Sequence, residues 1–357
     1  MTGKIEKIHY KFLIFFISSS AIINSFYFKY SELLVTYTIA FISSLALTYG
    51  GLKIIQRNKL YQKIREVGPT SHIRKENTPT LGGVFFISAF LLILVITDIS
   101  DIKVKIAIFL STLGFLLIGL SDDILSIKKK VNLGLTVNEK LIYQCIISST
   151  FIFFIFKNSL LNSQIFLLSN ISIDLNILIL PLSIITIISL SNAVNLTDGL
   201  DGLAAGCSAI TFSGLGTEIL INNREDFMIY SLICYAMSGV CMGFLQFNKH
   251  PAKIFMGDSG SLSIGAILGF ICVMTGSYLT TFIFSGVFFL ETLSVIIQVS
   301  YFKLTKKIFG KGKRILLMSP LHHHFELQGI KENKIVENFW KFNLILIILG
   351  IVLKISV

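Results

Sequence analysis

The sequence predicts an all-α polytopic membrane protein with about ten transmembrane helices. Of the 357 residues, 53% are hydrophobic and only 14% are charged, and the mean hydropathy is +0.77. Soluble domains carry about 25% charged residues, so this composition excludes a soluble fold. The apolar residues also form separate runs divided by short polar loops, which is the pattern of repeated membrane crossings.

Ten apolar runs have the length of bilayer-spanning helices, which need roughly 20 apolar residues. They cover 33–55, 81–97, 106–120, 141–156, 175–193, 203–221, 227–247, 261–278, 281–302 and 338–355. An eleventh run at 12–28 is short, and is either a further span or an interfacial helix. We expect a single integral membrane domain over 1–357, with its core in 33–357, because no polar stretch is long enough for a second core.

Basic residues gather in alternate loops, which fixes the expected orientation. One set of loops carries 20 Lys and Arg and the other set carries four. The basic set covers 56–80, 121–140, 194–202, 248–260 and 303–337. By the positive-inside rule this set is cytoplasmic, which predicts an active site on the cytoplasmic face and, with ten spans, both termini outside. The net charge of +11 then reflects topology and contact with anionic lipid or phosphate, not nucleic acid.

The most informative motif covers 192–202, where two amides and two carboxylates separate two apolar runs. Burying such groups in hydrocarbon costs free energy, so their presence there indicates a function. If a helix has begun there, Asp198 and Asp201 share one face, and the free N–H groups at its start favour an anion. A capped helix start without a ligand would explain one Asp, but not both together with Asn192 and Asn195.

Asp122 and Asp123 close a predicted span and are followed by Lys128, Lys129 and Lys130. Adjacent carboxylates at a helix end, where the macrodipole is negative, call for a cation. Mg²⁺ is the natural candidate because it takes oxygen ligands. The alternative is an ordinary pair of interfacial acids in water.

The stretch 255–261 reads Phe-Met-Gly-Asp-Ser-Gly-Ser and follows Asn248. It predicts a flexible turn that presents Asp258 beside bare backbone N–H groups, an arrangement that suits Mg²⁺ and phosphate together. Phe255 either stacks on a base or packs against the membrane.

His322, His323 and His324 cannot all bind one metal if they are helical, because successive side chains diverge by about 100°. Pro320 favours a non-helical entry. We therefore expect a loop that presents the imidazoles to phosphate or sugar oxygens, the alternative being an ordinary polar loop.

Two weaker signals complete the set. Lys75 and Thr80 precede a glycine pair at the start of a span, which suits phosphate contacts but is also common at helix starts. Glu291 and Gln298 lie seven residues apart inside a span, and are either functional or paired structurally.

Together these residues resemble the polyprenyl-phosphate N-acetylhexosamine-1-phosphate transferases, from about residue 57 to the C-terminus. The triple His followed by Phe-Glu favours the members that act on a muramoyl-pentapeptide donor over relatives that transfer N-acetylglucosamine phosphate. The matching stretches are 78–83, 122–123, 134–136, 192–204, 255–261, 291–298 and 318–326.

The resemblance implies a multi-pass enzyme of the bacterial inner (cytoplasmic) membrane, acting in peptidoglycan synthesis and hence in cell shape and division. It implies Mg²⁺, a UDP-N-acetylmuramoyl-pentapeptide donor, undecaprenyl phosphate as acceptor, and lipid I and UMP as products. A transporter is the rival class, but transporters usually show inverted repeats and acids at mid-bilayer. The sequence leaves the oligomeric state open, a homodimer being one candidate.

The resemblance also implies site roles. Asp258 is expected to be the Mg²⁺ ligand, and Asp122 and Asp123 the acidic pair at the reacting phosphates. Substrate contacts are expected from Lys75, Thr80, Asn192, Asn195, Asp198, Asp201, Asn248, Phe255, Gln298, His322, His323 and His324. Two basic residues usual in the family are replaced here by Ser126 and Asn138, so Lys128, Lys129, Lys130 or Lys140 would have to hold phosphate instead.

Overall fold

The computed structural model describes residues 21–22, 24, 31–58, 78–97, 101–129, 134–168, 171–221 and 227–355. In this part of the chain nine helices are long and apolar enough to cross a membrane, and α3 (Gly82–Ile96) is a shorter apolar helix. The prediction of an all-α polytopic membrane protein with about ten spans is confirmed. The run 12–28 lies outside the described residues, except for 21–22 and 24.

Each of the ten predicted spans corresponds to a helix. Besides α3, these are α2 (Ser31–Asn58), α4 (Ile102–Lys129), α5 (Val137–Lys157), α6 (Ile179–Thr197), α7 (Leu203–Ile221), α8 (Met228–Asn248), α9 (Gly257–Thr275), α11 (Gly286–Phe309) and α13 (Glu332–Ile355). Short elements that the sequence did not predict are β1 (Gln164–Leu168), β2 (Ile171–Asp174), η2 (Asn176–Leu178), α10 (Tyr278–Phe284) and α12 (Leu321–Leu327).

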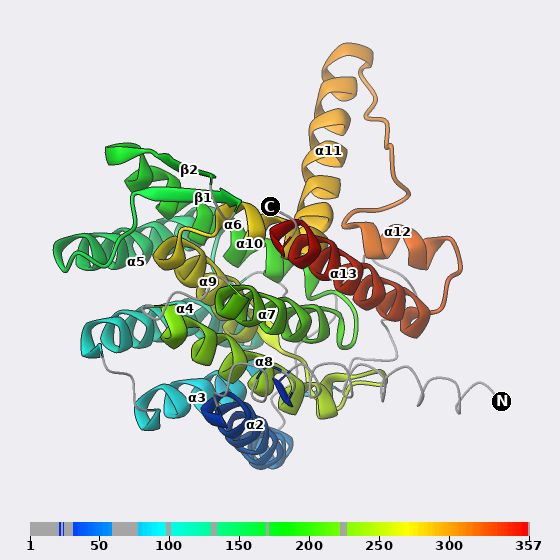
Figure 1. Cartoon of the computed structure of the whole chain (residues 1–357). Coiled ribbons are helices and arrows are strands. Elements are labelled where there is room, and N and C mark those ends of the chain that lie inside the picture. The colour runs from blue at the N-terminus through cyan, green and yellow to red at the C-terminus, as the bar shows by residue number, and fades with distance from the viewer. Residues whose placement is uncertain are drawn as a thin grey trace.

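The helices α7, α8 and α9 form the centre of the bundle, and the others surround them (Figure 1). The apolar stretch of each central helix is 89% buried, against 28% in α5 and in α11. The outer helices therefore carry large exposed side chains, such as Leu110 and Phe153. In a membrane protein such a surface faces lipid tails.

Glycines set the closest helix contacts. A Cβ added at Gly83 of α3 would lie 2.1 Å from the backbone N of Gly260 in α9, so the two backbones touch. A Cβ at Gly239 of α8 would lie 2.5 Å from the carbonyl oxygen of Tyr37 in α2. Small residues at such crossings allow close van der Waals packing between membrane helices.

The polar motifs meet at one end of the bundle, where the first turn of α5 and the end of α6 contact the first turn of α9, and the loops that follow α6 and α8 contact each other. The opposite end carries the antiparallel β1–β2 hairpin, in which Gln164 pairs with Asp174. The hairpin is attached beyond α9 by a hydrogen bond from the N–H of Phe166 to the carbonyl of Gly276 (3.0 Å). The site is thus assembled at one end only.

The structure corrects three expectations about local structure. Asp122 and Asp123 do not lie at the end of a helix, because α4 continues to Lys129 and buries them inside the bundle. Asp258 lies in the first turn of α9 and not on a flexible turn, since α9 begins at Gly257. The triple His lies within α12 and not in a loop, with Pro320 as the residue before the helix.

Candidate active site

The start of α9 is fixed by Asp123 from α4. Its Oδ1 accepts a hydrogen bond from the backbone N–H of Asp258 (2.9 Å), and its Oδ2 accepts one from the N–H of Ser259 (3.0 Å). A helix N-terminus has free N–H groups, and a carboxylate there stabilises them. Because both oxygens of Asp123 are engaged and the residue is only 2% exposed, it positions Asp258 and has little capacity left to hold a ligand.

Lys140 lies between the two other acids. Its Nζ is 3.1 Å from Oδ1 of Asp122 and also forms an ion pair with Oδ2 of Asp258. The side chains of Asp122, Asp258 and Lys140 are 12%, 24% and 22% exposed, so a ligand can reach them. The N–H of Leu135 donates to the same Asp122 oxygen (2.8 Å), which holds the α4–α5 loop against the site.

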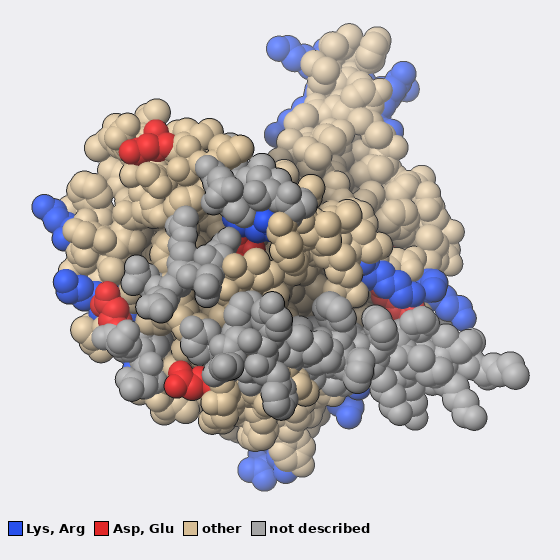
Figure 2. Space-filling model, in the orientation of Figure 1, with Lys and Arg blue, Asp and Glu red and all other residues tan. Residues whose placement is uncertain are grey.

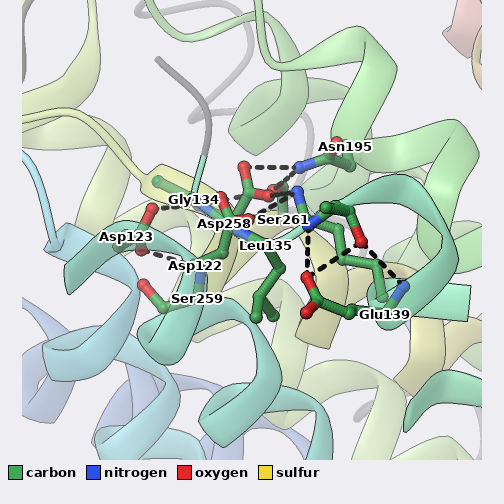
Figure 3. A network of polar contacts seen from close by, with 12 residues as sticks. Asp122, Asp123, Gly134, Leu135, Glu139, Asn195, Asp258, Ser259 and Ser261 are labelled. Carbon is green, nitrogen blue, oxygen red and sulfur yellow. Dashed lines mark hydrogen bonds and ion pairs between the residues drawn. The ribbon is translucent and has the colours of Figure 1, made fainter. Parts of the chain in front are cut away.

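We call Asp122, Asp123, Asp258 and Lys140 the carboxylate cluster, and Figure 3 shows its three acids converging from α4 and α9. One carboxylate oxygen from each acid lies within 4.8 Å of the others. Hard divalent cations take such oxygen ligands, and Asp122 and Asp258 are the two acids of the cluster whose side chains are partly exposed. Three acids balanced by one lysine leave a net negative charge, which also favours a cation. The cluster therefore fits a bound metal ion.

Asn195 joins the carboxylate cluster from α6. Its Nδ2 donates to Oδ1 of Asp258 and to the hydroxyl of Ser261, both at 2.9 Å (Figure 3). Asn192, one turn earlier, instead donates to Oε1 of Gln144 in α5 (2.8 Å). Of the two amides of the 192–202 motif, only Asn195 thus contacts the cluster, while Asn192 connects two helices beside it.

A second charged group, which we call the His250 clasp, consists of Asp201, His250 and Glu332. Nδ1 of His250 lies 3.1 Å from Oδ2 of Asp201 and 3.4 Å from Oε2 of Glu332. The N–H of Asp201 donates to Glu332 (2.8 Å), and the N–H of Ala252 donates to Asp201 (2.9 Å). The hydrogen bond to Asp201, followed by that to Glu332, raises the pKa of His250 to about 9.

The His250 clasp buries Asp201, one of the two acids of the 192–202 motif. The Asp201 side chain is 3% exposed and its carboxylate is held by its neighbours. Asp198, the C-terminal cap of α6, is partly exposed. The expectation that Asp198 and Asp201 share a helical face is wrong, because α6 ends at Thr197 and α7 begins only at Leu203.

Two further residues predicted to contact substrate, Asn248 and Gln298, instead bond backbone groups. The Asn248 side chain accepts from the N–H of Gly202 (3.1 Å) and donates to the carbonyl of Ile254 (3.0 Å), and the residue is 2% exposed. The Gln298 side chain accepts from the N–H groups of Ile315 and Leu316 and donates to the Leu316 carbonyl. Both amides order loops at the site end of the bundle.

The segment before α3 runs along the start of α9. The N–H of Phe255 donates to the carbonyl of Pro79 (2.7 Å), and the N–H of Gly82 donates to the carbonyl of Phe255 (2.9 Å). The Phe255 side chain is half-buried, whereas Thr80 is fully buried. Lys75 lies outside the described residues.

His322 is buried, with 1% exposure, and points away from solvent. Its Nδ1 is 3.1 Å from Oε2 of Glu291, an electrostatic contact and not an aligned hydrogen bond. A Cβ added at Gly199 would lie 2.1 Å from Nε2 of His322, so the ring packs directly on the α6–α7 turn. His322 therefore links α11 to this turn.

The other two imidazoles diverge on α12, as helical geometry requires. Nδ1 of His323 lies 2.7 Å from Oε2 of Glu326, and Nδ1 of His324 accepts from the N–H of Leu317 (3.2 Å). Each of the three residues thus has a different neighbour, and they do not form one metal site.

The sequence did not identify His250 and Glu332 as site residues, nor Gln144. Glu332 and Asp201 are 131 positions apart, and nothing local indicates that they meet. Lys140 was one of four lysines named as replacements for the missing basic residues. The structure brings Lys140 into the cluster, while Lys129 donates to the carbonyl of Gly134 (3.0 Å).

Comparison with known proteins gives two findings. The family model described as glycosyl transferase family 4 matches residues 105–276. The chain is 51% identical to the phospho-N-acetylmuramoyl-pentapeptide-transferase of Prochlorococcus marinus strain MIT 9301, over 100% of both chains. It is 54% identical to that of strain MIT 9515, over 100% of this chain and 98% of the relative, and 38% identical to that of Synechococcus sp. strain CC9605, over 91% and 93%.

Proposed function

The chain belongs to the phospho-N-acetylmuramoyl-pentapeptide-transferase family, and from this premise we propose its reaction and the residues that perform it. It transfers phospho-N-acetylmuramoyl-pentapeptide from the UDP-linked donor to undecaprenyl phosphate, which yields lipid I and UMP. Full-length identity of 51–54% to relatives of that name supports this activity. The convergence of Asp122, Asp123 and Asp258 around Lys140 is the observation that supports the site.

The chemistry is phosphoryl transfer. An oxygen of the lipid phosphate forms a bond to the sugar-linked phosphorus, the bond from that phosphorus to the UMP oxygen breaks, and UMP leaves. Such reactions need in-line positioning and charge neutralisation more than covalent participation. A site for two phosphorylated substrates must therefore supply positive charge.

Lys140 supplies one such charge from the chain itself. Its ammonium group lies between Asp122 and Asp258. It can therefore pair with a phosphate oxygen that takes the place of either carboxylate. Asp258 and Asp122 would hold Mg²⁺, which when bound neutralises the diphosphate and the departing UMP. Asn195, bonded to Asp258, orients that carboxylate.

We assign the acidic pair to positioning, within a direct single displacement. A general base would gain little, because a phosphate monoester has a second pKa of about 6 and is mostly dianionic at neutral pH. Asp123 is a poor covalent nucleophile because both of its oxygens accept hydrogen bonds from α9. A phosphorylated enzyme trapped with the UDP-linked donor alone would contradict this assignment.

The nucleotide is proposed to bind between the α6–α7 turn and the segment before α9. Asp198 and Phe255 have partly exposed side chains and are the direct contacts we propose there, and Lys75, outside the described residues, stays a sequence-based candidate. Three buried residues are proposed to support these contacts without touching the nucleotide: Asn248, Asp201 and His322. His323 and His324 of α12 are partly exposed, and we propose that their imidazoles contact the sugar.

The active end is proposed to face the cytoplasm of the bacterial inner membrane, where the nucleotide donor is made. Twenty Lys and Arg occur in the loops that the sequence assigns to this side, which the positive-inside rule makes cytoplasmic. A single cysteine introduced at Lys128 should react with a membrane-impermeant thiol reagent only in inverted vesicles. One introduced at Asp174 in the hairpin should react in intact cells.

The activity is tested by UMP release from the purified protein in detergent or vesicles. Release should require both UDP-N-acetylmuramoyl-pentapeptide and undecaprenyl phosphate, stop on addition of EDTA, and return with excess Mg²⁺. Turnover of UDP-N-acetylglucosamine with no turnover of the muramoyl donor would assign the chain to the sister activity instead. Release that is insensitive to EDTA would contradict the metal assignment alone.

A further inference from the structure

The outer half of α11 leaves the bundle. From residue 299 to residue 309 only Thr305 is buried, whereas the inner half buries Glu291, Ser294 and Gln298. The chain then returns through 310–317 towards α12, so the two segments form a projection from the molecule (Figure 1). We call residues 299–317 the basic arm.

The basic arm carries only positive charge. No Asp or Glu occurs between Glu291 and Glu326, a stretch that includes the whole arm. Its cations are Lys303, Lys306, Lys307, Lys311, Lys313 and Arg314. Among the described residues no carboxylate lies within ion-pair distance of any of them. Figure 2 shows these basic side chains around the projection with no acidic side chain beside them on that face.

Large apolar side chains are exposed between the cations. Ile308 is 61% exposed and Phe309 is 64% exposed, because both lie beyond the part of α11 that packs on the bundle. Other exposed apolar residues of the arm are Val299, Tyr301, Phe302, Leu304, Ile315 and Leu317. The positive-inside rule explains lysines at this place, but it gives no reason for exposed aromatic and aliphatic residues among them.

The basic arm is built as a defined element. The hydroxyl of Thr305 accepts a hydrogen bond from the N–H of Lys313 (2.8 Å), which attaches the returning segment to the helix. Phe302 packs on Gly312, where an added Cβ would lie 2.4 Å from the ring. Gln298 holds the base of the arm through Ile315 and Leu316.

We propose that the basic arm docks on the headgroups of anionic phospholipids in the leaflet that surrounds the active end. The apolar side chains enter the interface and the lysines meet lipid phosphates, as in amphipathic segments that bind membrane surfaces. Each Lys or Arg near such a surface contributes attraction that salt weakens. The arm continues a transmembrane helix, so it meets the bilayer before any soluble partner.

Docking would also bear on the site, because the arm ends beside α12. The N–H of Leu317 donates to Nδ1 of His324, and α12 carries the triple His. A docked arm therefore holds one wall of the proposed substrate site in place. The docking itself does not depend on the proposed activity, and its test needs no substrate.

The test places a fluorescent bimane at residue 308. The protein carries Ile308→Cys in a Cys145→Ser background, since Cys145 is the exposed cysteine of the described residues. It is reconstituted into phosphatidylcholine vesicles with or without phosphatidylglycerol, both containing a lipid quencher with a shallow doxyl group. Quenching should increase with phosphatidylglycerol and fall again in about 1 M salt, where the Debye length is about 3 Å.

Two matched variants complete the test. Lys306→Gln with Lys307→Gln should lower the apparent affinity for phosphatidylglycerol by about tenfold or more, as expected for two cations near a charged surface. Lys53→Gln with Arg57→Gln removes two exposed cations from the end of α2 and should leave the quenching unchanged.

Three outcomes would overturn the proposal. Equal quenching in both vesicles would mean that the arm does not recognise anionic phospholipid. No quenching in either would leave the arm in water, as for a soluble acidic partner. Quenching that requires undecaprenyl phosphate and ignores phosphatidylglycerol would make the arm a capture site for the acceptor lipid.

Discussion

The carboxylate cluster and the His250 clasp are built from similar groups at the same end of the bundle, yet they differ in how their charges are matched. In the clasp, both acids contact one imidazole, and backbone N–H groups satisfy Asp201 further. In the cluster, Lys140 pairs with Asp122 and Asp258, the side chains of both acids remain partly exposed, and Asp123 adds a third carboxylate. In the clasp the buried acids are matched by one imidazole, which is itself 42% exposed, whereas the cluster has surplus negative charge that can receive a cation and a substrate.

This difference separates residues that act from residues that position. Asp123 belongs to the cluster by location but resembles Asp201 of the clasp, since both are buried and accept backbone hydrogen bonds. We therefore expect substitutions at Asp258 and Lys140 to affect turnover first. Substitutions at Asp123 and His250 should affect stability or its pH dependence first.

The largest effect is expected from Asp258→Asn. The amide removes the charge that would hold the metal and that pairs with Lys140, so the rate of UMP release should fall by about 10³-fold. Asp174→Asn, an exposed acid in the hairpin at the opposite end, is the control and should retain the full rate. Comparable activity in Asp258→Asn would place the reaction elsewhere.

Lys140→Met should lower turnover by about 10²-fold, because the ammonium would no longer neutralise phosphate charge. The same change removes a positive charge beside the proposed metal ligands, so half-saturation should occur at a lower Mg²⁺ concentration. Lys140→Arg should recover part of the rate. A rise in the Mg²⁺ requirement of Lys140→Met would show that the lysine supports metal binding and does not compete with it.

Asp123→Asn should destabilise the protein by about 1–2 kcal/mol, since one of the two α9 hydrogen bonds loses its acceptor. Turnover should fall about 10–100-fold through misplacement of Asp258. The neighbouring Asp122→Asn is the matched comparison, because Asp122 does not cap α9 and its replacement should change the melting temperature less. Equal melting temperatures for the two variants would remove the distinction.

The smallest effect is expected at His250, and only above neutral pH. Its folded-state pKa of about 9 exceeds the ordinary value of 6.5. The stabilisation is therefore fully present below pH 6.5 and is lost as the pH rises through 9. In His250→Gln the melting temperature should depend less on pH between pH 6.5 and pH 9, and the metal requirement should stay the same. A pH profile of the melting temperature unchanged from the parent would show that the clasp does not cause this pH dependence.

The sequence predicted the ten spans because hydrophobic length alone determines whether a segment can cross a bilayer. It also predicted motifs that the structure brings together, since Asp258 and Asn195 bond directly and Asp123 caps the helix that bears Asp258. Loop charge predicted that these motifs share one end. Each of these inferences uses information that is local in the chain.

The sequence could not predict which polar residues face ligand and which close on one another. Asp122 and Asp123 resembled a helix end because a pair of acids is rarely tolerated inside an apolar helix, and the packing of α9 on α4 explains their burial. The site pairing of Asp201 with Glu332 depends on α13, which is distant in sequence. The triple His resembled a loop, yet the contacts of Leu321–Leu327 with α11 and α13 support a short helix.

The buried contact between Glu291 and His322 has an evolutionary consequence. Neither side chain is accessible to water, and replacing one alone leaves the other without its neighbour in a medium of low polarity. Stepwise divergence at either position is therefore unfavourable. Across related genomes the two positions should change in concert or stay fixed, and an aligned set of homologues with frequent single replacements would contradict this.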